Sequence, residues 1–404
     1  MFAREEPLTH ALAPHYAALR AIRTRRQLER SPLYAELKPE LERVLAGVER
    51  GDHAAVIASE TSHANAASTA NAGGAATANG GRVRVAAWNI QRGRRFDALR
   101  GALANDPELA SADVLLLSEV DCGMGRSGNR NVARALADAL GMSYAFGVSY
   151  LVLEDDFGEN PDGAPNTLAL AGTAILSKLP IARVANADLP ELRDKFSSSE
   201  KRLGKKRALV AELGGGEPLV VACGHLDSNA SPRQRAQQLG ALLACAESFG
   251  RARMLVGGDF NTTTYDLSSP PALAWNILHK LWVNGFAGTI AHYLTPEKHY
   301  EKVVFEELSK HAFTVEGFND RARGTLNYDL SDPFAIQKTR KAVGGLLTRL
   351  LQRLLRPWNG VVPARLDWFA GRGILPHAPR VVDPRGPDGR PISDHAAILV
   401  DVER

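Results

Sequence analysis

Short apolar runs recur along the chain from Arg82 onward, and each is six to ten residues long. Their length and their content of Val, Ile and Leu are typical of buried strands. The runs span 83–89, 113–120, 173–178, 208–213, 218–227, 252–261, 365–371 and 395–402. Apolar residues at helical spacing follow some of them, as in 131–141 and 231–250. Strands that partly alternate with helices and partly follow one another directly predict an α/β fold built in layers.

The first 58 residues show a different pattern, with apolar positions at helical spacing that predict an N-terminal region of two helices. In one of them Ser31 can cap the amino end, Pro32 can open the first turn and Gly51 can end the helix. Residues 59–81 consist almost entirely of Ala, Ser, Thr, Asn and Gly, which predicts a flexible linker. The main domain is therefore expected at 82–404, with a mostly helical insertion at about 267–360.

Composition narrows the class of protein only slightly. The 404 residues are 45% hydrophobic and 23% charged, which excludes a wholly disordered or fibrous chain. The net charge of +4 permits a polyanionic partner but does not require one. Cys122, Cys223 and Cys245 are widely spaced, which argues against a disulfide scaffold or a structural zinc site. With Glu5 and Glu6 where a signal peptide would be apolar, and with no run of 18 apolar residues, we expect a soluble, cytoplasmic protein.

Acids, amides and histidines gather at the ends of the predicted strands. Asn89 and Gln91, Glu119, His225 and Asp227, and Asp259 and Asn261 follow their runs, Asp367 lies within one, and Asp394 and His395 open the last. One such residue is typical of a turn, because Gly, Asp and Asn are common turn formers. If the last strand runs antiparallel to the others, all of these side chains fall on one edge of the fold. So many at one edge predict a site.

The residue types indicate a chemistry. Glu119, Asp394 and Asn89 offer the hard oxygen ligands that suit Mg²⁺ or Mn²⁺, whereas zinc or copper would call for more His or Cys. Asp259 could orient and deprotonate water, and Asn261 could hold the nucleophile or a phosphoryl oxygen. His225 and His395 could offset charge that develops on phosphorus. This set predicts metal-assisted hydrolysis of a phosphoester.

Seven motifs taken in order resemble the endonuclease/exonuclease/phosphatase superfamily, which contains DNase I-like nucleases, sphingomyelinases and inositol-polyphosphate phosphatases. They are "WNIQRG", "LLLSEVD", "GTAILSKLPI", "GHLDS", "GGDFN", "LDWF" and "SDHAAILVDV". The resemblance runs from about Val83 to Val402. It implies a four-layer α/β sandwich of the DNase I-like type, in which two mixed sheets pack face to face between helices.

The resemblance also implies roles for individual residues. Glu119, Asn89 and Asp394 match positions near the metal, with Glu119 as the main ligand. Asp259 matches the aspartate that activates water, with Asn261 as its companion. His395 matches a phosphate-contacting histidine that Asp367 orients, and His225 matches a second histidine at the scissile phosphate.

Two departures from the family pattern affect these expectations. Gln91 stands where some nucleases of the family have an acid, which favours one metal over two and places Gln91 among substrate-binding candidates. The stretch between Asn261 and Asp367 is longer than the family pattern, so the insertion is expected to lie near the site and to shape substrate choice.

Three further segments have more than one interpretation. "GMGRSG" at 123–128 fits a dinucleotide-binding turn, but the acids just before it favour a flexible loop from which Arg126 or Arg130 meets substrate phosphate. The basic, leucine-rich stretch 338–358 predicts a helix that covers a core, or one that lies on an anionic membrane or a phosphate backbone. The basic cluster at 200–210 is either a solvated loop or a means of steering an anionic substrate.

The resulting hypothesis is a Mg²⁺- or Mn²⁺-dependent phosphodiesterase whose substrate is a phosphoester, with nucleic acid and phospholipid both open. A phosphomonoesterase on the same fold is the alternative within the class. A module that binds phosphate without cleaving it is the alternative outside the class, and a nicotinamide-dependent oxidoreductase is a more distant one. Protein partners are unknown from the sequence.

Overall fold

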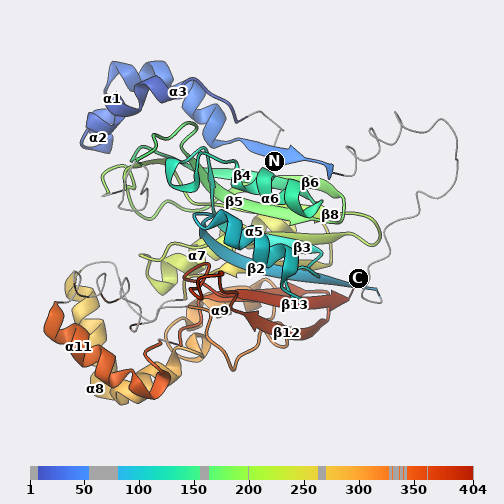
Figure 1. Cartoon of the computed structure of the whole chain (residues 1–404), viewed down its shortest axis with the longest axis vertical. Helices are drawn as coiled ribbons and strands as arrows, with labels where there is room; N and C mark the ends of the chain where they lie inside the picture. The colour runs from blue at the N-terminus through green and yellow to red at the C-terminus, as the bar shows by residue number, and fades with distance from the viewer. Residues whose placement is uncertain are drawn as a thin grey trace, which may run out of the picture.

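A computed structural model gives the arrangement of most of the chain (Figure 1). It describes residues 8–53, 81–154, 163–198, 200–262, 270–326, 330, 336, 340, 344–361 and 363–403. Nearly all of the predicted linker at 59–81 lies outside the described residues.

The larger of two sheets has eight strands. They are β1 (Val48–Gly51), β2 (Arg82–Arg92), β3 (Val114–Cys122), β4 (Ser143–Val152), β5 (Leu170–Ser177), β7 (Arg202–Gly204), β12 (Pro376–Val382) and β13 (Ala397–Glu403). Their order is β1-β4-β5-β3-β2-β13-β12, and the short β7 pairs with β4. The central pair β2 and β3 is parallel, whereas β13 runs antiparallel to β2. The residues before β13 therefore lie at the same edge as the residues that end β2 and β3, as the sequence analysis required.

The smaller sheet has five strands in the order β11-β10-β9-β8-β6. They are β6 (Ile181–Asp188), β8 (Arg207–Leu213), β9 (Leu219–His225), β10 (Met254–Asp259) and β11 (Asp367–Arg372). Strands β9 and β10 are parallel, and β11 is antiparallel to β10. In this register Asp259 is the direct partner of His225 on one side and of Asp367 on the other.

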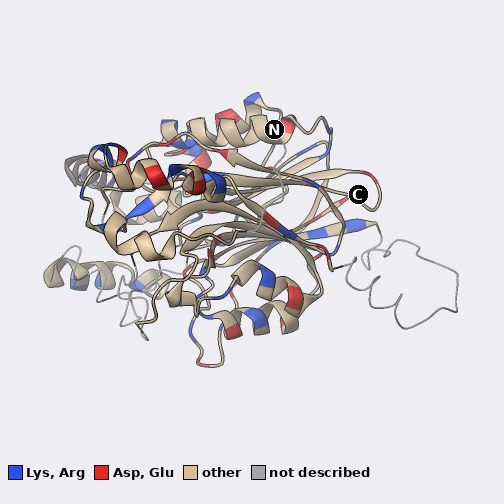
Figure 2. Ribbon diagram, turned by 90° about the horizontal axis from the view of Figure 1, so that it is seen from above, with Lys and Arg blue, Asp and Glu red and all other residues tan. Residues whose placement is uncertain are grey.

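The two sheets pack face to face around an apolar core to which Val85 and Leu116 contribute from one sheet and Val221 and Leu255 from the other. Helices cover the outer faces. The larger sheet carries α5 (Phe96–Asn105) and α6 (Val132–Leu140), and the smaller carries α7 (Pro232–Glu247) and α9 (Lys302–Lys310). Charged residues lie mostly on helices, on loops and near strand ends, while most of the length of the strands is uncharged (Figure 2). The predicted four-layer α/β sandwich is confirmed.

The N-terminal segment packs on the larger sheet. It contains η1 (Ala13–His15), α1 (Tyr16–Ala21), α2 (Arg25–Glu29) and α3 (Pro32–Leu45). Ser31 caps α3 by accepting a hydrogen bond from the Tyr34 amide, as predicted. The predicted helix end at Gly51 is wrong, because the chain turns after Leu45 and adds β1 to the sheet beside β4. Tyr16 and Leu19 are buried in the core cluster under this face.

The described part of the predicted insertion contains several helices, whereas its residues 311–326 form turns and isolated bridges. It holds α8 (Pro270–His292), which kinks at Gly285, then η3 (Pro296–Lys298), α9, α11 (Gly345–Leu354) and η4 (Arg356–Trp358). Helices α8 and α11 project from the body of the molecule in Figure 1. Only part of the predicted leucine stripe is buried, since Leu355 packs with Ile290 and Tyr293 while Leu346 is 88% exposed. Residues 338–339 and 341–343 of that stretch lie outside the described part.

None of the helices among the described residues is long and apolar enough to cross a lipid bilayer. Cys122, Cys223 and Cys245 are free thiols, two of them buried.

The glycine-rich stretch at 123–128 does not form a dinucleotide-binding turn. Residues Gly125–Ser127 make a short 3₁₀ helix, and α6 begins beyond it at Val132 with Asn131 as its cap. At the amino end of α6 the Arg134 amide therefore donates to the Asn131 side chain, and the glycines do not form the loop that would hold a pyrophosphate there.

Candidate active site

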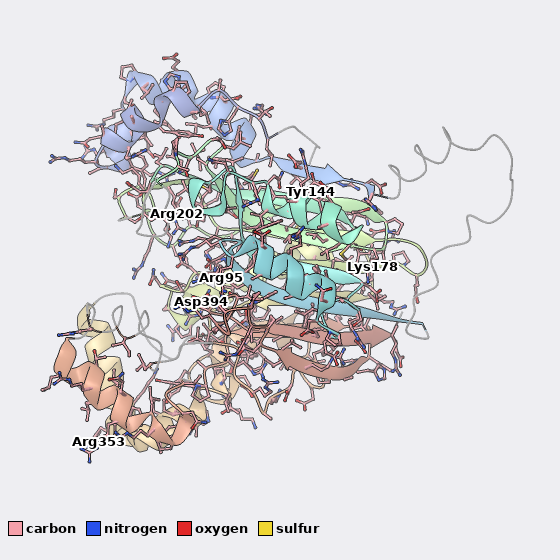
Figure 3. The ribbon with its side chains drawn as sticks, viewed as in Figure 1. Arg95, Tyr144, Lys178, Arg202, Arg353 and Asp394 are labelled. Atoms are coloured by element: carbon pink, nitrogen blue, oxygen red, sulfur yellow. The ribbon has the colours of Figure 1, made fainter. Side chains whose placement is uncertain are left out.

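The predicted residues come together where the two sheets meet at one edge. Asn89, Glu119 and His395 come from β2, β3 and the turn before β13 in the larger sheet, while His225, Asp259 and Asp367 come from β9, β10 and β11 in the smaller one. In Figure 3 Asp394 marks this edge, and Lys178, just beyond the end of β5, lies on the opposite side of the molecule. The site therefore occupies the seam between the sheets.

Two glycines place Asp259 in this seam. A Cβ atom on Gly258 would lie 2.2 Å from the Gly224 carbonyl oxygen, and its φ of +130° suits only glycine. A Cβ on Gly257 would lie 2.4 Å from the Phe369 ring. Close packing of β10 against its neighbours thus explains why Gly-Gly precedes Asp259.

The Asp259 carboxylate is buried and is the centre of the site. Its Oδ1 accepts a hydrogen bond from the Asn261 amide at 2.9 Å, and its Oδ2 accepts one from Asn89 Nδ2 at 3.1 Å. The same Oδ2 lies 3.6 Å from Nε2 of His225 and 3.8 Å from Nε2 of His395. Asn261 is held in turn by its own Nδ2, which donates to the Leu226 carbonyl. One carboxylate oxygen thus faces an amide and two imidazoles.

His395 is fixed from several directions. Its Nδ1 lies 2.8 Å from Asp367 Oδ2, and its carbonyl accepts a hydrogen bond from the Trp88 indole. Thr325, from within the insertion, accepts hydrogen bonds from the amides of Leu366 and Asp367 and so holds the partner of His395 in place. Burial opposes the charged form of His395, but the carboxylates of Asp367 and Asp259 outweigh it and raise its pKa well above the usual value. The ring is therefore an imidazolium near neutral pH.

Glu119 sits at a bulge in β3 with a φ of +51°. Burial would raise its pKa, but His225, Arg92 and Lys206 outweigh burial and lower the pKa to about 2. His225 Nε2 lies 3.9 Å from Glu119 Oε1. Burial, together with the charge of Lys206, lowers the pKa of His225 to about 4, so its imidazole is neutral near pH 7. Glu119 is therefore an ionised carboxylate that faces the charges of Arg92 and Lys206.

Asn89 and Asp394 lie close to each other along the edge. Ser393 joins their segments, because its hydroxyl donates to the Asn89 carbonyl at 2.6 Å. Asn89 Oδ1 accepts a hydrogen bond from the Gln91 amide, and Asp394 is half-buried. Gln91, Glu119 and Asn261 all adopt left-handed backbone conformations, with φ of 46°, 51° and 48°. Such conformations are costly for non-glycine residues and tend to gather at functional sites.

The remaining predicted residues are held by other partners. Arg126 is only 6% exposed and is held by Asp121 and Glu200 at 2.7 to 2.9 Å. Arg130 lies over the Phe96 ring at 5.0 Å and donates to the Ser127 carbonyl. Asp227 pairs with Lys195. The structure therefore brings neither Arg126 nor Arg130 directly to Asp259, and Arg126 meets carboxylates in this conformation.

Sequence reasoning missed four residues beside Glu119, namely Arg92, Glu200, Arg202 and Lys206. Three of them belong to the basic cluster at 200–210, which was the available signal. Arg92 Nε lies 3.7 Å from Glu119 Oε2 and Arg92 Nη2 lies 3.6 Å from Glu200 Oε2. Arg92 immediately follows Gln91, and nothing in its own segment distinguishes it from a solvated arginine.

Two sets of residues could hold a metal. Within the described residues, Asp259, Asp367 and His395 offer ligand atoms that all lie within 4.8 Å of one another. However, the 2.8 Å contact between His395 and Asp367 is a hydrogen bond that occupies one nitrogen of the ring and one carboxylate oxygen. The Glu119 carboxylate makes no hydrogen bond to a described residue, and oxygen ligands suit a hard divalent cation. Glu119 is therefore a second candidate ligand for such an ion.

Comparisons with known proteins were consistent with one family. The model of the Endonuclease/Exonuclease/phosphatase family matches residues 86–395. Similar solved structures include an endonuclease/exonuclease/phosphatase from Beutenbergia cavernae, with 17% identity, a TM-score of 0.48 and coverage of 80% of this chain and 71% of that one. A humanized D. rerio TDP2 has 14% identity, a TM-score of 0.45 and coverage of 80% and 100%. The 3′ phosphatase NExo from Neisseria, bound to product DNA hairpin, has 17% identity, a TM-score of 0.44 and coverage of 79% and 98%. No curated protein matches the sequence.

Proposed function

Because the chain belongs to the Endonuclease/Exonuclease/phosphatase family, whose model matches residues 86–395, we propose that it is a divalent-metal-dependent phosphodiesterase. Family membership supports the general reaction, which is hydrolysis of a phosphoester. The dependence on metal and the preference for a diester are the further steps of the proposal.

One observation carries the proposal. Three pairs of side chains join the two sheets at the same edge, and each pair takes one residue from each sheet. They are Asn89 with Asp259, Glu119 with His225, and His395 with Asp367. These pairs place a buried carboxylate, a neutral imidazole, an imidazolium and an ionised glutamate around one point. A base, proton donors and a site for a cation are the groups that phosphoester hydrolysis needs.

Asp259 would orient the attacking water and accept its proton. Hydrogen bonds from Asn89 and from the Asn261 amide hold its two oxygens in place, so the carboxylate does not need to reorganise for the reaction. Asn261 acts as a positioning residue in this scheme, because its amide binds Asp259 and its side chain binds the Leu226 carbonyl.

The two histidines would act on the phosphoryl group. His395, kept charged by Asp367, would donate to a non-bridging oxygen and offset the negative charge that grows in the transition state. His225 is neutral near pH 7 and can donate one hydrogen bond from Nε2 to the same group. Gln91, which follows Asn89 in a left-handed conformation, remains a candidate contact to the substrate.

Glu119 would hold Mg²⁺ or Mn²⁺, with Asn89 and Asp394 as further oxygen ligands. The fit rests on the Glu119 carboxylate, which is ionised and makes no hydrogen bond to the described residues. A bound divalent ion would act as a Lewis acid that offsets negative charge on the phosphoryl oxygens.

Hydrolysis of two simple esters tests the proposal. Bis(p-nitrophenyl) phosphate and p-nitrophenyl phosphate would be offered with Mg²⁺, with Mn²⁺ and with EDTA. We expect cleavage of the diester that requires metal, and faster turnover of the diester than of the monoester. In Glu119→Gln, Mn²⁺ binding measured by electron paramagnetic resonance should weaken at least about tenfold, whereas the exposed control Glu29→Gln should bind normally. Cleavage of the monoester alone would favour the phosphomonoesterase, and cleavage of neither, with Mn²⁺ bound, would favour a non-catalytic module.

A further inference from the structure

A cavity of about 70 Å³ opens next to the candidate active site, bordered by Glu119 and His225. It lies between the ends of β3, β4 and β5 and the segment that contains β7. Figure 3 shows Arg202, from this segment, on the same side of the molecule as Asp394. The charged residues that line the cavity beyond Glu119 include Arg92, Arg126, Arg202, Lys206, Asp121 and Glu200. Glu119 and His225 belong both to the cavity wall and to the candidate active site. A group inside the cavity would therefore lie next to a group bound at Asp259.

Glu200 organises the arginines around this cavity. Its buried carboxylate pairs with Arg126 at 2.7 Å, with Arg92 at 3.6 Å, and with Arg202. One carboxylate therefore serves three guanidinium groups. Arg126 also pairs with Asp121, and Arg92 also pairs with Glu119. Arg92, Arg126, Arg202 and Lys206 therefore outnumber the carboxylates of Glu119, Asp121 and Glu200 that line the cavity. The excess of positive charge would grow if Glu119 bound a metal ion.

Two hydrogen-bond donors on the cavity wall have no partner. Arg202 Nε and Thr173 Oγ1 are buried, and neither makes a hydrogen bond to a described residue. Both residues line the cavity. A buried donor left unpaired costs about 1–3 kcal/mol, so such atoms call for an explanation in a native protein. An acceptor-rich ligand in the cavity would satisfy both.

The cations of the cavity are also held in an environment that disfavours their charge. Burial lowers the pKa of Arg202 and of Lys206, in the last case to about 8. The neighbouring charges of Arg92 and Arg126 lower the pKa of Arg202 further. An anion placed among them would relieve this repulsion and replace part of the lost hydration.

We propose that this cavity binds a phosphate group carried by the substrate next to the phosphoester that is cleaved. This assignment extends the proposed function and rests on it, because the bound phosphate belongs to a substrate only if the protein cleaves a phosphoester. Paired guanidinium groups match the oxygens of phosphate in geometry and in charge, and Arg202 Nε and the Thr173 hydroxyl add single donors. The volume suits a group of a few heavy atoms but not a nucleobase or an acyl chain. The substrate class is thus a phosphoester with a second phosphate close to the first.

Binding of inorganic phosphate in EDTA, measured by isothermal titration calorimetry, tests the cavity without reference to activity. We expect Arg202→Met to weaken binding about tenfold, and Thr173→Val, which keeps the side-chain shape and removes the hydroxyl, to weaken it by about threefold or more. The control Arg233→Met changes an exposed arginine on α7 and should bind as the wild type does. Asp259→Asn should also retain binding, because Asp259 does not line the cavity.

The results separate the two proposals. No binding by the wild type, or binding lost in Asp259→Asn and kept in Arg202→Met, would overturn the phosphate site whatever the activity. Binding that depends on Arg202 and Thr173 in a protein that cleaves no ester would overturn the proposed function and leave the phosphate site in place.

A matched pair of diesters tests the role in substrate choice. The p-nitrophenyl ester of thymidine 5′-phosphate would be compared with the same ester carrying an additional 3′-phosphate. We expect kcat/KM to be about tenfold higher for the phosphorylated compound in the wild type and in Arg233→Met, and this preference to disappear in Arg202→Met. Equal preference in all three proteins would contradict the assignment.

Discussion

Nδ1 of His395 lies 2.8 Å from Oδ2 of Asp367, and the pair joins the turn before β13 in one sheet to the first residue of β11 in the other. Two residues 28 positions apart in the chain are thus held as one unit at the seam between the sheets. The other imidazole nitrogen faces Asp259. Asp367 therefore fixes both the orientation and the charge of the ring that faces the site.

Asp367→Asn tests this relationship. The substitution keeps the size of the side chain but removes the charge that favours the imidazolium, so kcat for bis(p-nitrophenyl) phosphate should fall by about 10²-fold. KM should change little, because Asp367 acts through His395 and does not touch the substrate. Asp97→Asn, at a position whose side chain is 81% exposed, is the control. An unchanged kcat in Asp367→Asn would show that His395 does not depend on its partner.

Gly258 offers a test of how the fold places Asp259. Gly258→Ala would put a Cβ atom 2.2 Å from the Gly224 carbonyl oxygen at a φ of +130°, which should destabilise the protein by about 1–3 kcal/mol or more. Gly101→Ala is the matched change in α5, where nothing lies within 4 Å of the new atom, and it should stabilise by about 0.5–1 kcal/mol. Urea denaturation measures both. If Gly258→Ala left the free energy of unfolding as high as Gly101→Ala does, β9 and β10 would not be packed as described.

The sequence predicted the central strands well because they are covered on both faces. Strand β3 is flanked by helices on one side and by the smaller sheet on the other, so its apolar run is nearly continuous. Strand β12 was missed because it is an edge strand with two prolines and a histidine and is mostly half-buried. Strand β4 was also missed, since its serines and Gly147 interrupt the apolar pattern although all ten residues are buried.

The residues of the site also divide into those that the sequence predicted and those that it did not. Glu119, His225, Asp259 and His395 could be grouped from the sequence, because strand direction alone brings strand ends to a common edge. The ion pair of Arg92 with Glu200 could not, because it depends on how the end of β2 meets a loop more than 100 positions later in the chain. Arg126 was expected to be free for substrate, but its partner Asp121 lies only five positions away and takes up its guanidinium.

The N-terminal helices give a third prediction. Leu19 is fully buried in the same cluster as Phe146 of β4 and Leu136 of α6, so the N-terminal segment should unfold together with the main domain. Leu19→Ala should lower the free energy of unfolding by about 2–5 kcal/mol in a single transition. Leu346→Ala, at a side chain that is 88% exposed, should change it by less than about 0.5 kcal/mol. A separate early transition in Leu19→Ala would instead favour an independent N-terminal unit.

Lys206 gives a prediction for pH. Burial, helped by Lys195 and opposed by Asp227, Asp259 and Glu119, lowers the pKa of Lys206 to about 8, and its ammonium also faces His225. The charged form is favoured below that pH and is lost above it, so KM for the substrate with the second phosphate should rise above about pH 8. Lys206→Arg should move this rise to higher pH, because a guanidinium keeps its proton. The same rise in both proteins would exclude Lys206 as its cause.

The most direct test compares hydrolysis of bis(p-nitrophenyl) phosphate by the wild type, by Asp259→Asn and by Asp138→Asn, all in saturating Mn²⁺. Asp138 is an exposed residue of α6 and serves as the control. Asp259→Asn should retain Mn²⁺ binding and the circular dichroism spectrum of the wild type but lose at least about 10²-fold in kcat, because the attacking water has lost its base. Full turnover by a folded, Mn²⁺-bound Asp259→Asn would contradict the assignment of Asp259 as the catalytic base.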